Sequence, residues 1–257
     1  MASKRKLLSQ VFLQDPHLVK KLISNSSIKS DDIVIEVGPG MGIITKLLAH
    51  KAKKVIAIEK DISLYKRLKI NLAKIKNIEL IKFDALEFEF PDYDYKVFAN
   101  IPFHIEGQFV RKLINSSNPP KDTYLVMRKE VAERMAGIPK DGQFSIIHKP
   151  MFDLSIFYRF RRSDFKPKPR VESVMLRIRL REKLLIPLNS YELYKKFIIQ
   201  GFGGGRRIKQ NLSPMFSKTQ LVTLANKLRL NLQSKPSDIK LEQWINLFEF
   251  WKQKAQK

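Results

Sequence analysis

The 257-residue sequence contains no cysteine, which excludes disulfide bonds, thiolate metal sites and cysteine nucleophiles. It also lacks any run of about eighteen consecutive apolar residues, the length that a membrane-spanning helix requires. The basic N-terminus is interrupted by polar residues where a signal peptide would be apolar. We therefore expect a cytoplasmic protein without a membrane partner.

Acidic residues are scarce: 25 Asp and Glu stand against 49 Lys and Arg, a formal net charge of +24. Such a chain repels itself unless a polyanion neutralises it, so the charge favours a nucleic-acid partner. A generally basic proteome would give the same composition. A membrane surface is a weaker alternative, because no basic amphipathic helix carries aromatic anchors. The four histidines show no metal-ligand spacing, and we predict no metal site.

The first 180 residues alternate short β-rich runs with helical patterns, which is typical of a parallel sheet with crossover helices. Strands are expected at 33–37, 55–58, 78–83, 95–99, 124–127, 154–160 and 173–178. The turn-rich loop 163–170 is too short for a crossover helix, so the last two strands should be antiparallel. After residue 185 only helical patterns occur, at 191–199, 218–228 and 241–251. We predict an α/β catalytic domain, 1–183, and a more densely basic helical domain, 184–257.

A glycine-rich turn, 38–42, follows the first expected strand, which contains Glu36. Glycines allow a tight turn and the close approach of a ligand, although an ordinary chain reversal explains such a turn equally well. Glu59 and Asp84 end the next two strands, where open α/β sheets bind ligands. Glu59 is suited to accept hydrogen bonds from ribose hydroxyls, and Asp84 from an adenine amino group. Together these residues indicate a nucleoside cofactor.

The sequence Asn100-Ile101-Pro102-Phe103 follows the fourth expected strand. The amino nitrogen of adenine is a poor nucleophile, because its lone pair is delocalised into the ring. The Asn100 side-chain oxygen and the Ile101 carbonyl can accept its hydrogen bonds and aim the lone pair at a sulfonium methyl group. Pro102 fixes the backbone, and Phe103 offers a face on which an extruded base stacks. An isolated Asn-Pro turn would mean little, but behind a nucleoside site it indicates methyl transfer to adenine.

The sequence resembles the ribosomal RNA adenine dimethyltransferases, and most closely the Erm group, over nearly its whole length. The matching segments are 9–13, 36–42, 59, 84–85, 100–103, 127–134, 149–152, 165–171 and 242–248. The resemblance implies a Rossmann-like class I S-adenosylmethionine-dependent methyltransferase sheet with a small C-terminal all-helical domain. It also implies a monomer that methylates 23S ribosomal RNA and confers macrolide–lincosamide–streptogramin B resistance.

The resemblance also assigns roles to residues. The segment from Gln10 to Leu13 is expected to fold over S-adenosyl-L-methionine, and the glycine turn to hold its methionine portion. Cofactor binding is expected at Gln10, Leu13, Glu36, Gly38, Gly40, Glu59, Asp84, Ala85 and Asn100. The target base is expected to bind at Asn100, Ile101, Pro102 and Phe103.

Three positions depart from the family pattern. Val11 stands where Asn is usual, which removes a side-chain contact to the cofactor. Glu106-Gly107 replaces a common Ser/Thr pair, and the Glu106 charge is expected to face an RNA-binding mouth. Arg128 occupies a position where Gln is common. Because the four chemistry residues are intact, we expect these changes to affect efficiency.

Two groups of cations are predicted to contact RNA phosphates. The glycine-rich segment 201–209 contains Arg206, Arg207 and Lys209, and Arg161 and Arg162 precede the loop at Phe165. Each group, taken singly, also fits an ordinary solvated charge run.

Three alternatives remain at this stage. The small-subunit (16S) dimethyltransferases share the cofactor motifs, and the Arg206 to Lys209 stretch resembles them. A non-enzymatic nucleic-acid-binding protein could keep the basic surface, but the intact Asn100 motif argues against it. A DNA adenine methyltransferase would carry a double proline, whereas Ile101 occupies the first of those positions.

Overall fold

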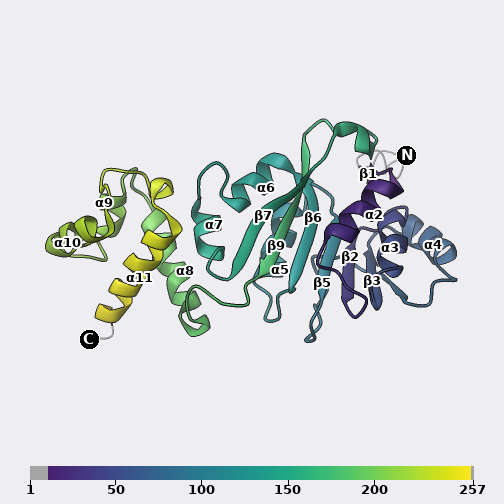
Figure 1. Cartoon of the computed structure of the whole chain (residues 1–257), viewed down its shortest axis with the longest axis horizontal. Helices are drawn as coiled ribbons and strands as arrows, with labels where there is room; N and C mark the ends of the chain where they lie inside the picture. Colours follow the sequence, from purple (N-terminus) through teal and green to yellow (C-terminus); the bar gives the residue numbers. More distant parts are fainter. Residues whose placement is uncertain (1–10, 256–257) are drawn as a thin grey trace. The chain divides into compact units, whose positions relative to one another are not determined.

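The structure, a computed structural model, describes residues 11–255 (Figure 1). The chain forms two compact units. The first comprises the residues up to Ala132 together with Ser155–Leu180, and the second comprises Glu133–Leu154 together with the residues from Arg181 onwards. The break after Leu180 lies close to the predicted boundary at 183. Segment 133–154, which the sequence analysis assigned to the catalytic domain, contacts the C-terminal helices.

A seven-stranded sheet forms the framework, in the order β4-β3-β2-β5-β6-β9-β7. Its strands are β2 (Ile33–Val37), β3 (Lys54–Glu59), β4 (Ile78–Lys82), β5 (Lys96–Asn100), β6 (Asp122–Arg128), β7 (Phe152–Arg159) and β9 (Ser173–Leu180). The first five in the spatial order are parallel, and β9 is antiparallel to β6. The central strands are largely apolar and buried because helices cover both faces of a parallel sheet.

Strands β7 and β9 run antiparallel, as predicted from their short connection. The Phe160 N–H donates to the Ser173 carbonyl at 3.1 Å, and the Arg181 N–H donates to the Met151 carbonyl at 2.9 Å. The first bond joins the end of β7 to the beginning of β9, and the second joins the beginning of β7 to the end of β9. The expected fold of parallel strands with an antiparallel edge is therefore confirmed.

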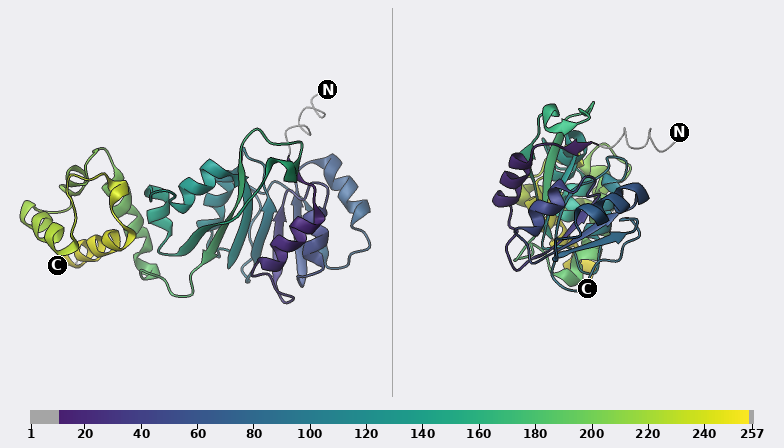
Figure 2. Two further views of the ribbon diagram at one scale, coloured as in Figure 1. Left: turned by 45° about the horizontal axis from the view of Figure 1, so that its top comes forward. Right: turned by 90° about the vertical axis from the view of Figure 1, so that its right-hand side faces the viewer.

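The helices of the first unit are α2 (Pro16–Asn25), α3 (Ile43–Ala49), α4 (Ile62–Asn71), α5 (Glu106–Ile114) and the first half of α6 (Lys129–Ala136). Asp15 caps α2 by accepting a 2.8 Å bond from the His17 N–H, and Pro16 is its first residue, as predicted. Helices α3 and α4 pack against β3 and β4 (Figure 2). Because these strands are parallel, their carboxyl ends lie together at one end of the sheet, where the candidate site is found.

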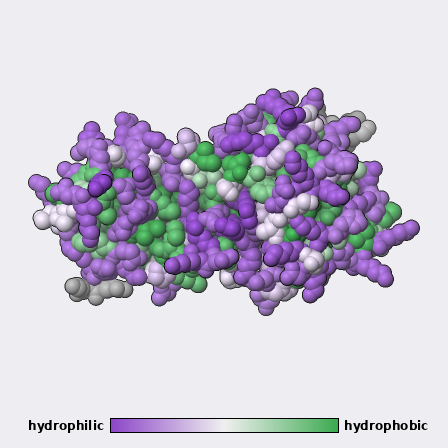
Figure 3. Space-filling view, in the orientation of Figure 1, coloured by the Kyte–Doolittle hydropathy of each residue, from purple (hydrophilic) through white to green (hydrophobic). Residues whose placement is uncertain are grey.

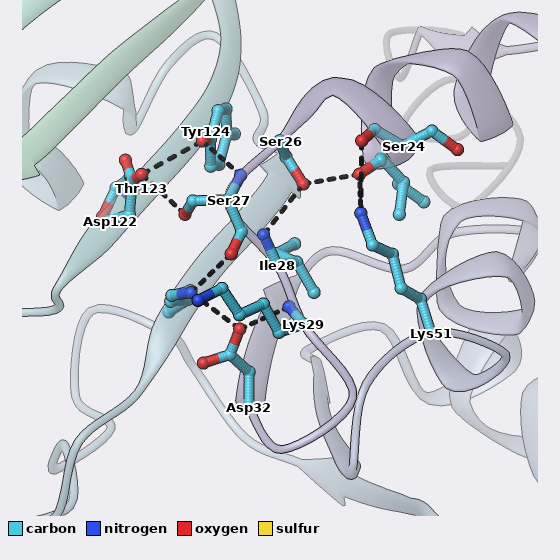
Figure 4. Close-up of polar contacts among 12 residues, drawn as sticks. Ser24, Ser26, Ser27, Ile28, Lys29, Asp32, Lys51, Asp122, Thr123 and Tyr124 are labelled. Atoms are coloured by element: carbon cyan, nitrogen blue, oxygen red, sulfur yellow. Dashed lines mark hydrogen bonds and ion pairs between the residues drawn. The ribbon is translucent and has the colours of Figure 1, made fainter.

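A buried polar cluster fixes the loop between α2 and β2 to the amino ends of the strands (Figure 4). The Asp122 carboxylate, of which only 2% is exposed, accepts bonds from the Ser27 hydroxyl at 2.7 Å and the Tyr124 hydroxyl at 3.0 Å. Arg177 neutralises it with a guanidinium N–O distance of 2.6 Å. A buried charge is tolerated when it is paired and hydrogen-bonded in this way. The cluster therefore stabilises the sheet at the edge opposite the candidate site.

A second, two-stranded sheet was not predicted. Strand β1 (Phe12–Leu13) pairs antiparallel with β8 (Phe165–Lys166). The sequence analysis interpreted 163–170 as an irregular loop, because a two-residue strand carries no periodic pattern. Leu13 and Phe165 are both buried in the hydrophobic core of the first unit. This pairing determines where the segment before α2 lies.

The second unit contains α7 (Gln143–His148), α8 (Tyr191–Phe202), α9 (Ile208–Leu212), α10 (Lys218–Leu228) and α11 (Leu241–Ala255). The predicted helices correspond to α8, α10 and α11. Trp244 is fully buried and stacks on Phe202 with ring centroids 5.4 Å apart. Gly201 permits this packing, because a β-carbon there would lie 2.6 Å from the Trp244 ring. Helix α7 joins this unit because the Tyr194 hydroxyl donates to the Ile146 carbonyl at 2.9 Å.

Hydrophilic residues cover much of the face drawn in Figure 3. Within residues 11–255, none of the helices combines the length and apolar character that crossing a bilayer demands.

Candidate active site

The glycine turn after β2 adopts a backbone that only glycine takes readily. Gly38 and Gly40 have φ angles of 65° and 58°, in the left-handed region. At Gly40 the ring of Phe12 approaches so closely that a β-carbon would lie 2.4 Å from its Cε1 atom. At Gly38 the nearest neighbours are the Asn100 carbonyl and Pro102, 3.7 and 3.8 Å from a β-carbon. The turn is therefore in contact with both the N-terminal segment and the Asn100 motif.

Glu36 is a buried carboxyl group that has no cationic partner within residues 11–255. The residue is 0% exposed, and among the described residues neither carboxylate oxygen has a hydrogen bond. Burial raises the pKa of Glu36 to about 8; the Thr45 hydroxyl nearby lowers it less, and the Glu59 carboxylate raises it further. An isolated buried carboxylate is unfavourable unless a ligand compensates it. Glu36 is therefore suited to a cationic ligand.

Glu59 connects the end of β3 to the glycine turn. Its two carboxylate oxygens accept bonds from the Asp61 N–H at 2.8 Å and the Gly40 N–H at 3.4 Å. Burial raises the pKa of Glu59, and these N–H groups counteract part of the rise. The carboxylate is thus held at the carboxyl edge of the sheet, beside the turn, as the sequence predicted.

Asp84 lies just beyond β4 and is already paired. Its carboxylate lies 2.5 Å from the Lys60 ammonium and accepts a 3.0 Å bond from the Leu86 N–H. The bond from Lys60 is the largest cause of the lowered pKa of Asp84. Ala85 beside it is buried, with 6% exposed. Glu59 thus ends β3, and Asp84 lies two residues beyond the end of the adjacent strand β4.

Asn100 is the last residue of β5 and contacts the N-terminal segment. Its Nδ2 atom donates a 2.6 Å bond to the Val11 carbonyl. Because a carbonyl only accepts, the amide nitrogen must face Val11, and the Oδ1 atom stays available as an acceptor. Ile101 is buried, and the Pro102 carbonyl accepts from the Ile105 N–H at 3.1 Å. Phe103 is half-buried at the start of the next loop.

A narrow cavity of about 20 Å³ joins the N-terminal segment, the glycine turn and Asn100. It is lined by Phe12, Leu13, Gly38, Pro39, Met41, Ile43, Ile44 and Asn100. Pockets that enclose small molecules typically measure about 300 Å³ or more, so this cavity by itself is too small for a nucleoside cofactor. Sequence reasoning found the glycine turn and Asn100 and expected segment 10–13 to cover the cofactor, but it assigned no role to the Phe12 ring or to the Val11 carbonyl. Gln10 lies outside the described residues.

The prediction that Glu106 faces an RNA-binding mouth is wrong. Glu106 is 1% exposed, because its carboxylate accepts bonds from the Arg128 backbone N–H at 3.0 Å and from Arg128 Nε at 2.5 Å. Two of the three departures from the family pattern therefore contact each other. Sequence spacing could not reveal this, since 22 positions separate them.

The candidate RNA-binding cations are all exposed. Arg161 and Arg162 lie in the turn before β8, in the first unit, and Arg206, Arg207 and Lys209 lie at the start of α9, in the second. Sequence analysis missed one further cation beside them, Lys235. Within the second unit, a cavity of about 430 Å³ is lined by Phe202, Gly205, Arg206, Lys235, Pro236 and Ser237.

The chain is similar to known proteins over almost its entire length. The profile of the family described as "Ribosomal RNA adenine dimethylase" matches residues 1–253. A protein from Nostoc sp. named "Ribosomal RNA small subunit methyltransferase A" is 30% identical over 265 residues, which cover 96% of this chain and 97% of that protein. The crystal structure of "23S rRNA methyltransferase ErmE" has a TM-score of 0.86 at 26% identity and covers 94% of this chain and 99% of that one. A dimethyladenosine transferase from Plasmodium falciparum has a TM-score of 0.74, also at 26% identity, with coverages of 95% and 98%.

Proposed function

Because the chain belongs to the ribosomal RNA adenine dimethylase family, we propose that it methylates the exocyclic amino nitrogen of adenine in small-subunit ribosomal RNA. The observation that carries the choice of substrate is the near full-length relative from Nostoc sp., whose name specifies the small subunit. The comparisons leave the predicted 23S target and the predicted antibiotic resistance unconfirmed, and they favour the small-subunit alternative.

The expected Rossmann-like methyltransferase fold and S-adenosylmethionine as the cofactor are confirmed by the family and by the superposed structures. When bound, the cofactor supplies an electrophilic methyl group on a sulfonium. The unpartnered buried carboxylate of Glu36 fits this cationic molecule, and the glycine turn leaves no β-carbon in its way. We assign its binding to Glu36, Gly38, Gly40, Glu59, Asp84, Ala85 and Asn100, with Leu13 and the undescribed Gln10 in the covering segment.

The Asn100 motif orients the target base. With its nitrogen held by the Val11 carbonyl, the Asn100 side chain presents Oδ1 to the amino group of an incoming adenine. The Ile101 carbonyl is the second proposed acceptor, Pro102 fixes the backbone that carries it, and Phe103 stacks on the extruded base. Positioning of the nitrogen lone pair supplies most of the catalysis, and no strong general base is required.

The exposed cations are proposed to bind RNA phosphates. Arg161 and Arg162 belong to the sheet unit, and Arg206, Arg207 and Lys209 belong to the helical unit. The high net charge of +24 supports a polyanionic substrate. We propose that the helical unit contributes RNA affinity and that the sheet unit performs the chemistry.

A 23S target is the second candidate, supported by the TM-score of 0.86 with ErmE. Radiolabelled methyl transfer distinguishes the two targets. The substrates are small-subunit and large-subunit ribosomal RNA, each tested as protein-free RNA and as an assembly intermediate. We expect label in the small-subunit RNA, located by primer extension, and none with the Asn100→Ala variant. Label confined to large-subunit RNA, together with macrolide resistance of the expressing host, would overturn the proposal.

A further inference from the structure

Two residues that depart from the family pattern form an ion pair next to the Asn100 motif. The Glu106 carboxylate accepts from both the backbone N–H and the Nε atom of Arg128, and its side chain is only 2% exposed. The resemblance places small hydroxyl residues at the first position and glutamine at the second. In this chain both positions are charged, and the two side chains form one ion pair. The two departures therefore act as one unit.

The pair lies where two strand-to-helix junctions meet. Glu106 is the first residue of α5, three positions after Phe103, so its charge also lies at the positive end of a helix dipole. Arg128 is the last residue of β6, two positions after Val126, which is the register partner of Asn100. The buried carboxylate thus holds Arg128 at the carboxyl edge of the sheet, beside the strand that ends in Asn100.

The Nη1 and Nη2 atoms of the Arg128 guanidinium remain available to bind a ligand. The side chain is 44% exposed although its carboxylate partner is buried. Glu106 engages Nε and the backbone N–H, and within residues 11–255 no hydrogen bond to Nη1 or Nη2 is present. Two parallel N–H donors of a guanidinium match the oxygens of a phosphate. A side chain that is already held in place also loses less entropy on binding.

We propose that Arg128, oriented by Glu106, binds a phosphate of the RNA strand beside the target adenosine. This inference rests on the proposed function, because it requires the target base to reach Asn100. A strand that delivers a base to the end of β5 carries its phosphates past the ends of the neighbouring strands. Of the two neighbours of β5, β2 is followed by the glycine turn and β6 ends in Arg128. Glu106 is a positioning residue in this arrangement, and Arg128 is the RNA contact.

The test compares Arg128→Gln, Glu106→Gln and the double variant with Lys54→Gln as a control. Lys54 begins β3 at the opposite edge of the sheet and pairs with Glu79, so its replacement removes one cation far from the site. RNA affinity is measured against salt, and KM and kcat of methyl transfer are measured at saturating cofactor. Arg128→Gln should lower the slope of log affinity against log salt by about 1. It should raise KM by about 5- to 20-fold with kcat nearly unchanged, whereas Lys54→Gln should change neither.

Glu106→Gln keeps the cation but weakens its fixed orientation. We expect it to raise KM by a few-fold with the salt slope unchanged, and to have no further effect when Arg128 is already Gln. Additive effects in the double variant would contradict the positioning role. An unchanged salt slope and KM for Arg128→Gln, or a fall in kcat alone, would overturn the phosphate contact.

A folding defect is checked by thermal unfolding, because Arg128→Gln leaves a buried carboxylate without its cation. If that variant does not fold, Arg128→Lys provides the test. Because lysine keeps the positive charge, the slope of log affinity against log salt should not change. Loss of the planar guanidinium should still raise KM. An unchanged KM for Arg128→Lys would contradict the proposal. The assays use whichever ribosomal RNA accepts methyl groups, so a large-subunit target would overturn the proposed function and leave this test valid.

Discussion

The side-chain amide nitrogen of Asn100 lies 2.6 Å from the backbone carbonyl oxygen of Val11. This bond connects the last residue of β5 to the segment before β1, 89 positions earlier in the chain. It leaves Oδ1 of Asn100 as the group that can accept from an adenine amino group. Val11 contributes only its backbone, so the loss of the usual asparagine side chain at position 11 does not affect this contact.

Replacing Asn100 should reduce turnover far more than cofactor affinity. Asn100→Ala removes the acceptor that orients the target nitrogen, and we expect kcat to fall about 10²- to 10³-fold. The kcat of Asn100→Asp should fall by a similar factor, because a carboxylate cannot donate a hydrogen bond to the Val11 carbonyl. Val11→Ala is the matched control, because it keeps that carbonyl. Single-turnover methyl transfer measures the effect, and a large loss in Val11→Ala would argue against this assignment.

Shortening Phe12 should accelerate cofactor exchange. The Phe12 ring packs on Gly40 and borders a cavity of only about 20 Å³, so we expect the ring to move when the cofactor enters. We expect Phe12→Ala to raise both the association and the dissociation rate constants of S-adenosylmethionine, measured by rapid mixing. Phe83→Ala, at an exposed aromatic beyond β4, is the comparison. Unchanged rates in Phe12→Ala would show that the ring does not gate entry.

Glu36 should make stability depend on pH. Its pKa is about 8 in the folded protein against 4.5 when unperturbed, so between these values the folded state holds a proton that the unfolded state has lost. Stability therefore falls as the pH rises from about 4.5 to about 8, and this contribution is fully lost above that range. Glu36→Gln should flatten the fall of the unfolding temperature over this window. A parallel pH dependence in both proteins would contradict the prediction.

The same carboxylate should make cofactor binding depend on pH. A cationic ligand favours ionised Glu36, so affinity for S-adenosylmethionine should increase as the pH approaches about 8. Glu36→Gln should bind more weakly at about pH 8 and show a smaller pH dependence. Isothermal titration at several pH values measures both quantities. An unchanged affinity profile in the variant would place the cationic part of the cofactor elsewhere.

Neutralising Arg206 and Arg207 should weaken RNA binding in a salt-dependent manner. Both side chains are exposed, and Arg206 lines the cavity in the helical unit. If each contacts one phosphate, Arg206→Ala with Arg207→Ala should lower the slope of log affinity against log salt by about 2. Methyl transfer at saturating RNA should be nearly unaffected. An unchanged slope would remove these two residues from the RNA interface.

Asp122 should be essential for stability, in contrast to Asp94. Asp122→Ala removes the buried carboxylate that pairs with Arg177 and accepts from Ser27 and Tyr124, and it should lower the free energy of unfolding by about 3 kcal/mol. Asp94 pairs with Lys121 on the surface with 76% of its side chain exposed, and Asp94→Ala should change stability by less than about 0.5 kcal/mol. Denaturant unfolding compares them, and equal losses would mean that the buried cluster is not the cause.

Local sequence patterns predicted most of the sheet and most of the residues at the carboxyl ends of its parallel strands. Strand β2 begins and ends where predicted, and the other strands differ by a few residues, because buried parallel strands require apolar runs of limited length. Asp15 and Pro16 specified the start of α2 through the chemistry of a helix end. Glu59, Asp84 and Asn100 were identifiable because parallel strands bring their carboxyl ends to one edge.

The sequence by itself therefore determined the order of strands and helices, the glycine turn and the residues that end each parallel strand, since these depend on backbone conformation and burial over a few neighbouring positions. Only the tertiary structure decided that β1 pairs with β8, that Val11 holds Asn100 and that Glu106 turns inward to Arg128. It also decided that segment 133–154 packs with the C-terminal helices. Each of these contacts joins residues far apart in the chain, and the direction in which a side chain points depends on the packing around it.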